Sequence, residues 1–200
     1  MKRKWFRCSF IALGILVLIA TVNFIPTLSL KTNEMIKLDG KWIDVYYETE
    51  ADAAKDVFEY AEGETETIAE RLGFTENPDV NVYIYDYQNT MQTKKYGFVA
   101  PLLGLNWYIG DNIGTDVILT SPANPGEVHT YDNNKYAVLH EIVHAYVSVL
   151  NEDVDLWLTE GCALYLTNGE PFYRDYKEVF GKSKADIYDE WVEYIREYYQ

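Results

Sequence analysis

Basic side chains, cysteine and histidine are scarce in this sequence. Its 200 residues include 17 Lys and Arg against 32 Asp and Glu, with only two Cys and three His. Such an acidic chain repels phosphate backbones, so nucleic acid is not expected as a partner. Cys8 and Cys162 are the two cysteines, and Cys8 lies inside an apolar segment. We therefore expect no intramolecular disulfide.

Apolar and aromatic residues, in contrast, are plentiful. Hydrophobic residues make up 48% of the chain, with 18 Tyr and 5 Trp. This composition excludes a disordered chain, which combines low hydrophobicity with high charge. Residues 31–200 have the length of one domain and can bury a core. They carry a net charge of −19, which gives the domain as a whole no electrostatic reason to lie on anionic lipid.

The first 30 residues differ from the rest. Residues 1–7 are basic, and residues 8–25 form an uncharged, largely apolar run of 18 residues that ends at Pro26. About 20 apolar residues span a bilayer, whereas a secretory signal core has roughly 7–15. We expect residues 1–30 to be an uncleaved membrane anchor, with membrane contact through residues 8–25. The basic start predicts a single-pass protein with residues 31–200 outside the cytoplasm. The alternative is secretion after cleavage of a signal peptide.

Hydrophobic periodicity and turn residues predict an α+β domain. After a polar linker at 31–40, alternation or short apolar runs predict strands over 41–49, 80–85, 105–109 and 116–120. Helical spacing predicts helices over 51–72, 88–96, 135–150, 156–167 and 184–199. Residues 121–133 contain two Pro and a Gly and are expected to be a loop. Strands mixed with helices come first and helices alone come last, which is typical of the α+β class.

The motif with chemical content is His140-Glu141-Ile142-Val143-His144. Residues four apart on a helix lie about 6 Å apart along its axis, on one face, so both imidazoles can reach one metal ion. Glu141 is turned about 100° away and can instead reach a water molecule at that ion. The alternative is a pair of histidines in the core, but burying two imidazoles and a carboxylate without a metal is costly.

A catalytic zinc ion takes three protein ligands and leaves one position open. Glu160, on the next predicted helix, is the candidate third ligand. The 15 residues between His144 and Glu160 leave room for a turn at 151–155 and a returning helix. The alternative for Glu160 is a solvated carboxylate on a helix surface. Cys162 is expected to be a small packing residue, since it is turned about 200° from Glu160.

His140–His144 followed by the segment Trp157-Leu158-Thr159-Glu160-Gly161-Cys162-Ala163-Leu164-Tyr165 resembles the gluzincin zinc metallopeptidases. The compact bacterial peptidase MA-like domains are the most similar group, over residues 95–168. The resemblance implies a zincin-like fold, a small mixed sheet with an active-site helix and a glutamate helix. It implies Zn²⁺ bound by His140, His144 and Glu160, with Glu141 as general base. Gly161 and Ala163 would allow close helix packing, and the strand 116–120 would be the edge strand that receives a peptide.

The sequence departs from the larger members of that group at two points. The interval to the glutamate is short, and no later His is present to stabilise an oxyanion. A Tyr could take that role, and the sequence does not choose among the candidates, which are Tyr165, Tyr173, Tyr176 and Tyr188. His129 and Tyr131 could also line the cleft, although a structural role is the simpler interpretation.

The functional expectation is zinc-dependent hydrolysis of peptide bonds in a peptide or protein substrate. Two alternatives belong to other classes. One is a catalytically inactive zinc-binding domain that acts as a surface receptor or regulator. The other is a metal-free anchored binding module, which the many Tyr residues would suit. The C-terminal helix could also fold over the cleft, as in a latent zymogen.

Overall fold

The computed structural model describes residues 2–151 and 154–167, and the side chains of residues 2–8, 156 and 157 lie outside the description. Its centre is one mixed sheet of five strands in the order β1-β2-β3-β5-β4. The strands are β1 (Ile36–Asp39), β2 (Asp44–Tyr47), β3 (Asn81–Tyr85), β4 (Gly110–Ile113) and β5 (Asp116–Thr120). Strands β2, β3 and β5 are parallel, and β1 and β4 pair antiparallel at the two sides.

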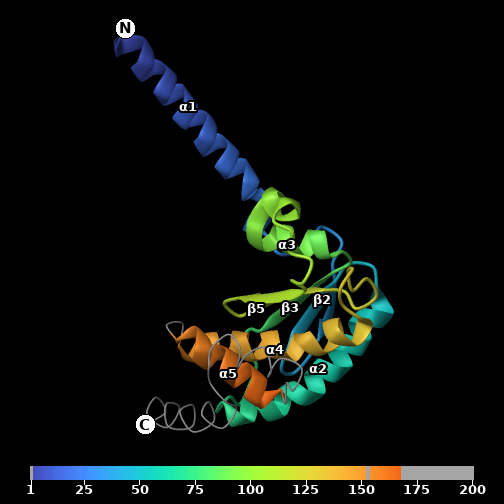
Figure 1. Ribbon diagram of the computed structural model, residues 1–200. Helices are drawn as coiled ribbons and strands as arrows, with labels where there is room; N and C mark the ends of the chain where they lie inside the picture. Colours follow the sequence, from blue (N-terminus) through green and yellow to red (C-terminus); the bar gives the residue numbers. More distant parts are fainter. Residues whose placement is uncertain (1, 152–153, 168–200) are drawn as a thin grey trace.

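Helices cover both faces of the sheet (Figure 1). On one face lie α2 (Ala51–Arg71), α4 (Tyr131–Leu150) and α5 (Leu156–Leu166). On the other lies α3 (Gln88–Tyr96), which is followed by the 3₁₀ helix η2 (Gly97–Leu102). The helix α1 (Lys2–Asn23) and the 3₁₀ helix η1 (Ile25–Leu28) precede the sheet and join the molecule at the α3 side.

Alternation along the central strands builds two cores. Val82 and Ile84 of β3 point to the α2 and α4 face, together with Val117 and Leu119 of β5. Their neighbours point to the opposite face, where Tyr83, Tyr85, Met91, Tyr108 and Ile118 form the second cluster. A parallel sheet that is covered on both faces needs apolar side chains on both, which is the pattern of these two strands.

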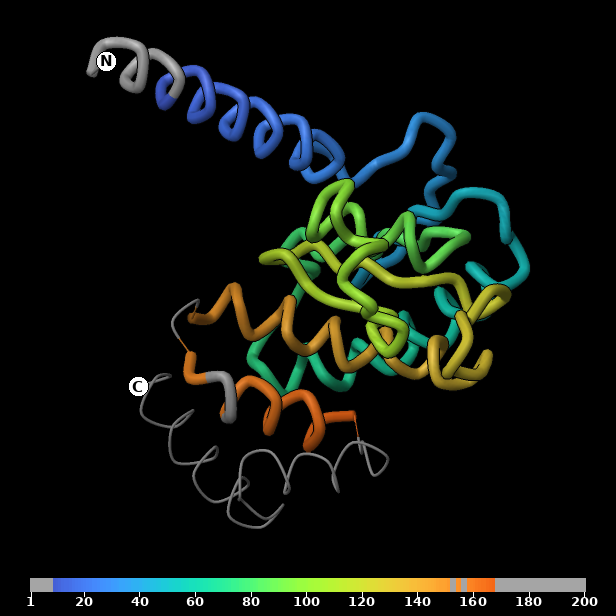
Figure 2. Tube along the Cα trace, turned by 45° about the horizontal axis from the view of Figure 1, so that its top comes forward, coloured from blue at the N-terminus to red at the C-terminus, as the bar shows by residue number. Residues whose placement is uncertain are grey.

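The N-terminal helix projects from the body of the molecule (Figure 2). It has 22 residues, and the side chains of residues 9–22 are all exposed. Among the described residues, no helix is both long enough and apolar enough to cross a membrane.

The α+β class predicted from the sequence is confirmed, and α3 and β5 have the predicted bounds. The strand predicted at 105–109 is wrong, because the carbonyl oxygens of Leu105, Asn106 and Tyr108 accept hydrogen bonds from the amide side chains of α3 instead of from a strand. The edge strand β4 comes later, at Gly110. Residues 31–40, predicted as a linker, contain β1. The helix predicted at 184–199 lies outside the described residues.

Candidate metal centre

The helix α4 carries the His-Glu-Ile-Val-His motif and begins four residues earlier than its apolar pattern predicts. Thr130 and Asn133 form a capping box, in which the Thr130 hydroxyl accepts a hydrogen bond from the Asn133 N–H at 3.2 Å. In return the Asn133 side chain accepts one from the Thr130 N–H at 3.0 Å. Such a cap satisfies N–H groups that the helix itself cannot pair, so α4 can start inside the expected loop.

His140, His144 and Glu160 converge from two helices. The Nε2 atoms of the two histidines are 3.0 Å apart. The Glu160 carboxylate offers Oε2 to His140 at 3.2 Å and Oε1 to His144 at 3.3 Å. Among the described residues, these three form a group whose ligand atoms lie close enough together that they could hold a metal ion. The predicted meeting of the three side chains is therefore present, while their role as metal ligands stays a prediction.

The spacing of these atoms suits a small divalent cation. Ligand atoms about 2.0–2.1 Å from a tetrahedral zinc ion lie roughly 3.4 Å from one another. The observed separations of 3.0, 3.2 and 3.3 Å are close to that value. Two imidazole nitrogens and one carboxylate are also a donor set that zinc prefers in catalytic sites. The residues present therefore fit a zinc ion with one further position open.

Charge balance at the site favours an ionised Glu160. Burial raises the pKa of this carboxyl group, but hydrogen bonds from His140 and His144 outweigh burial and hold its pKa well below the usual range. The side chain is 28% exposed, against 12% for His140 and 8% for His144. A buried carboxylate that keeps its charge needs cationic or donor partners, and here both partners are imidazoles.

Glu141 lies on the same helix, in a different electrostatic setting. Burial raises the pKa of its carboxyl group to about 7, against the opposing effect of nearby His140. The negative charges of Asp111 and Glu160 contribute to this rise, and Lys95 opposes it. The two glutamates of the site therefore differ in pKa. Such a difference separates a group that stays charged from one that can exchange a proton near neutral pH.

A pocket of about 280 Å³ opens over these groups. Its walls come from α4, α5, β4 and the segment leading into β4. The lining residues are Trp107, Tyr108, Gly110, Asp111, Asn112, His140, Glu141, His144, Thr159 and Glu160. Gly110 lies so close to α4 that an added Cβ would be 3.2 Å from Cγ of Glu141. Small size at position 110 thus lets the edge strand approach the motif.

The strand beside the pocket is not the one that the sequence indicated. The segment 116–120 was expected at the edge of the sheet, but β5 pairs with β3 on one side and with β4 on the other. The last strand of the described sheet is β4. The apolar run of β5 is typical of an interior strand, and the more polar sequence Gly-Asp-Asn-Ile of β4 suits an edge.

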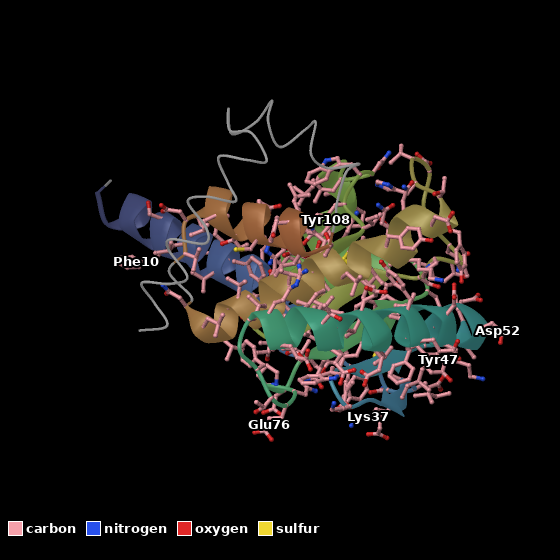
Figure 3. All side chains as sticks on the ribbon, turned by 90° about the horizontal axis from the view of Figure 1, so that it is seen from below. Phe10, Lys37, Tyr47, Asp52, Glu76 and Tyr108 are labelled. Carbon is pink, nitrogen blue, oxygen red and sulfur yellow. The ribbon has the colours of Figure 1, made fainter. Side chains whose placement is uncertain are left out.

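Two residues that line the pocket, Tyr108 and Asp111, and one that contacts Asp111, Lys95, were not expected from the sequence. Asp111 of β4 forms an ion pair with Lys95 of α3 at 2.8 Å. The same Asp111 oxygen accepts a hydrogen bond from the Tyr108 hydroxyl. Tyr108, labelled in Figure 3, brings its ring into the second core and lines the pocket. Lys95, Tyr108 and Asp111 belong to no motif, so only the aromatic and glycine-rich composition around them could have drawn attention to this segment.

Three described residues that the sequence named do not line the pocket, namely Tyr165 as an oxyanion candidate and His129 and Tyr131 as possible cleft residues. Tyr131 donates its hydroxyl hydrogen to Asp56 at 2.9 Å, at the start of α4. The His129 ring is hydrogen-bonded to the carbonyl oxygen of Trp107 at 2.8 Å, and Tyr165 packs against the main core. Tyr173, Tyr176 and Tyr188 lie outside the described residues. Within the described part of the chain, Tyr108 is the only tyrosine that lines the pocket.

Three further residues of α5, namely Gly161, Cys162 and Ala163, are packing residues. Cys162 is buried in the main core with a free thiol, which confirms the packing role predicted for it. Gly161 and Ala163 are also buried. The buried side of α5 therefore faces the core while Glu160 faces the pocket.

Comparison with known proteins identifies no relative of this chain. Neither a family model, nor a curated protein, nor a solved structure matches the chain significantly.

Proposed function

We propose that this protein is a zinc-dependent peptide hydrolase of the gluzincin type. The observation that supports it best is the convergence of His140, His144 and Glu160 from two helices, at separations that suit one tetrahedral cation. Those three residues would hold the ion. Bound there, zinc would supply Lewis acidity that polarises a carbonyl group and acidifies water.

Glu141 is the proposed general base. Its carboxylate accepts a proton from water in the pocket and delivers that proton to the nitrogen of the leaving amine. A pKa of about 7 suits this exchange, because a base works best when its pKa is near the working pH. The Tyr108 hydroxyl donates to Asp111, so it would have to leave that carboxylate before it could stabilise an oxyanion.

The substrate is proposed to be an extended peptide. The edge strand β4 borders the pocket at Gly110, Asp111 and Asn112. A peptide that adds to the outer side of β4 would gain main-chain hydrogen bonds and pass over Glu141. This assignment gives β4 the role that the resemblance had placed on residues 116–120.

For location, we propose that residues 1–30 tether the protein to the cell membrane, with the remainder on the extracytoplasmic side. The apolar run 8–25 and the basic residues before it support this arrangement. Secretion after cleavage of a signal peptide is the competing outcome, and the mass of the mature N-terminus distinguishes the two.

The test compares the full chain with Glu141→Gln, purified in detergent without chelator. We expect one zinc ion per chain in both proteins. Hydrolysis of a library of fluorogenic peptides should fall by about 10²–10⁴-fold in the variant, the usual contribution of a general base. Glu64→Gln, an exposed substitution on α2, is the matched control and should keep full activity. Full activity of Glu141→Gln would remove Glu141 from this role.

One observation favours a second candidate, a zinc-binding domain without catalysis. The single tyrosine of the described pocket has its hydroxyl engaged by Asp111, so no free tyrosine hydroxyl lines the described site. Stoichiometric zinc together with no cleavage of any library peptide would favour this receptor or regulator. Absence of zinc from the purified wild-type protein would exclude both candidates.

A further inference from the structure

Two short 3₁₀ helices, distant in sequence, expose large apolar side chains next to each other. η1 follows α1 directly, and η2 follows α3, and the two are in contact. Six residues form what we call the docking face, namely Phe24 (50% exposed), Ile25 (53%), Leu28 (81%), Phe98 (58%), Leu102 (83%) and Leu103 (46%). Exposed apolar side chains gathered in this way mark an interaction surface rather than ordinary protein surface.

The docking face is held rigidly to the end of α1. The Asn23 side chain donates to the Tyr96 carbonyl at 3.1 Å and accepts from the Val99 N–H at 2.8 Å. Gly97, with φ +74°, leaves the room for this contact, because an added Cβ would lie 2.1 Å from the Asn23 carbonyl oxygen. The Lys94 ammonium further binds the Ser29 carbonyl at 2.8 Å. α1, η1 and η2 therefore present one continuous surface.

The charge around the docking face differs from that of the whole chain. The chain carries 32 acidic residues, yet none occurs in residues 1–33 or 87–110, the segments that supply the face. The cations nearest in sequence are Lys31, which is exposed, and Lys94 and Lys95, which are partly exposed, with Lys95 paired to Asp111. The acidic composition that disfavours contact of the domain with anionic lipid is thus absent from this one region.

We propose that the docking face inserts into the interfacial layer of a lipid bilayer. Continuity with α1 argues for lipid as the occupant, because the side chains of α1 from Phe10 to Val22 are exposed on all sides and mostly apolar. A helix that is apolar all round suits hydrocarbon and not water. Side chains such as Phe and Leu with nearby Lys are also the composition of interfacial anchors.

This arrangement would orient the domain. The sheet lies between the α3 side, which carries η1 and η2, and the helices α4 and α5 (Figure 1). With η1 and η2 in the interface, the two helices that carry His140 and Glu160 would lie on the far side of the sheet from the lipid. The candidate metal centre would then be reached by substrate from the aqueous phase. The docking proposal itself does not depend on the chemistry at that site.

The experiment uses the full chain with Cys8→Ser, reconstituted into vesicles of phosphatidylcholine and phosphatidylglycerol at 3:1. An environment-sensitive fluorophore is attached at Leu102→Cys, at Val17→Cys on α1, or at Val128→Cys. Val128 is 60% exposed and apolar but outside the docking face, so it is the matched control. Cys162 is buried, so its thiol should not react with the fluorophore and only the introduced cysteine is labelled. Circular dichroism checks that each variant folds.

We expect a blue shift at positions 17 and 102 on reconstitution and none at 128. Bromines in the acyl chains should quench the label at 102 at least about threefold more than the label at 128, because interfacial side chains sit at the headgroup–acyl boundary. A label at 102 that stays as water-exposed as that at 128 overturns the proposal. If position 17 is then still quenched, the tether stands and only the docking face fails. A blue shift at 102 without bromine quenching would mean that a second copy, not lipid, covers the face, and would equally overturn it.

Discussion

The Nε2 atoms of His140 and His144 lie 3.0 Å apart on successive turns of α4. Two imidazole lone pairs repel at that distance unless a proton or a cation lies between them. Because both side chains are at least 88% buried, water cannot take that role freely. The Glu160 carboxylate reaches both rings and supplies a negative charge. A bound divalent cation would remove this repulsion and satisfy all three groups at once.

Removing the third ligand should weaken metal binding. Glu160→Ala leaves two imidazoles as ligands. Loss of a residue that only supports a metal ligand weakens metal binding by up to about 100-fold, so loss of the ligand itself should weaken zinc binding by more than that. Competition with a chromophoric chelator measures the zinc affinity of each protein. Zinc should also raise the Tm of the wild-type protein and not that of the variant, since binding to the folded state alone stabilises it. Glu127→Gln, outside the pocket, is the control, and equal affinity of Glu160→Ala and wild type would contradict the site.

Acid should weaken the junction between α2 and α4. The Asp56 carboxylate accepts hydrogen bonds from Lys135 at 2.6 Å and from Tyr131 at 2.9 Å. The hydrogen bond from Lys135, and then that from Tyr131, lower the pKa of Asp56 below its ordinary 3.8. A lowered pKa means that this stabilisation is present above about pH 4 and is lost as the pH falls through the folded-state pKa.

Asp56→Asn should therefore unfold at a lower urea concentration than wild type at pH 7, and the difference should shrink as the pH approaches 3. Glu59→Gln changes the same charge at an exposed position of the same helix and should show no such convergence. A gap between Asp56→Asn and wild type that stays constant with pH would mean that packing, and not the ion pair, accounts for it.

Glu62 fixes the chain just before β2. Its carboxylate accepts hydrogen bonds from the N–H groups of Lys41 at 2.6 Å, Trp42 at 3.1 Å and Ile43 at 3.2 Å. Glu62→Ala would leave these donors without their partner, and we expect a loss of roughly 2–3 kcal/mol in the free energy of unfolding. Urea denaturation measures it against Glu64→Ala, which is exposed on the same helix. A loss no larger than that of the control would exclude the anchoring role.

Replacing Gly63 by Ala should stabilise the protein. α2 runs through it from Ala51 to Arg71, and an added Cβ would meet no atom within 4 Å. In an exposed helix interior Ala is more favourable than Gly by about 1 kcal/mol. Gly63→Ala should therefore raise the urea midpoint.

Gly97→Ala should have the opposite effect. The positive φ of Gly97 and its contact with Asn23 both oppose a side chain, so this variant should lower the urea midpoint.

The sequence by itself determined the features that repeat along the chain over short distances. The period of four places His140 and His144 on one face of a helix, and the alternation in β3 and β5 sends Val82 and Tyr83 to opposite cores. The presence of a second helix carrying Glu160 followed from the length of the interval after His144. Each of these depends on residues near one another in the chain, where backbone geometry fixes side-chain direction.

Only the tertiary structure decided which distant segments meet. No local pattern shows that Lys95 reaches Asp111, that Gly110 lies against Glu141, or that β4 and not β5 is the edge strand. The same holds for Asn23 and Gly97, which join α1 to η2 across more than 70 residues. Such contacts depend on the order of strands in the sheet and on packing between layers, and side-chain periodicity carries no information about either.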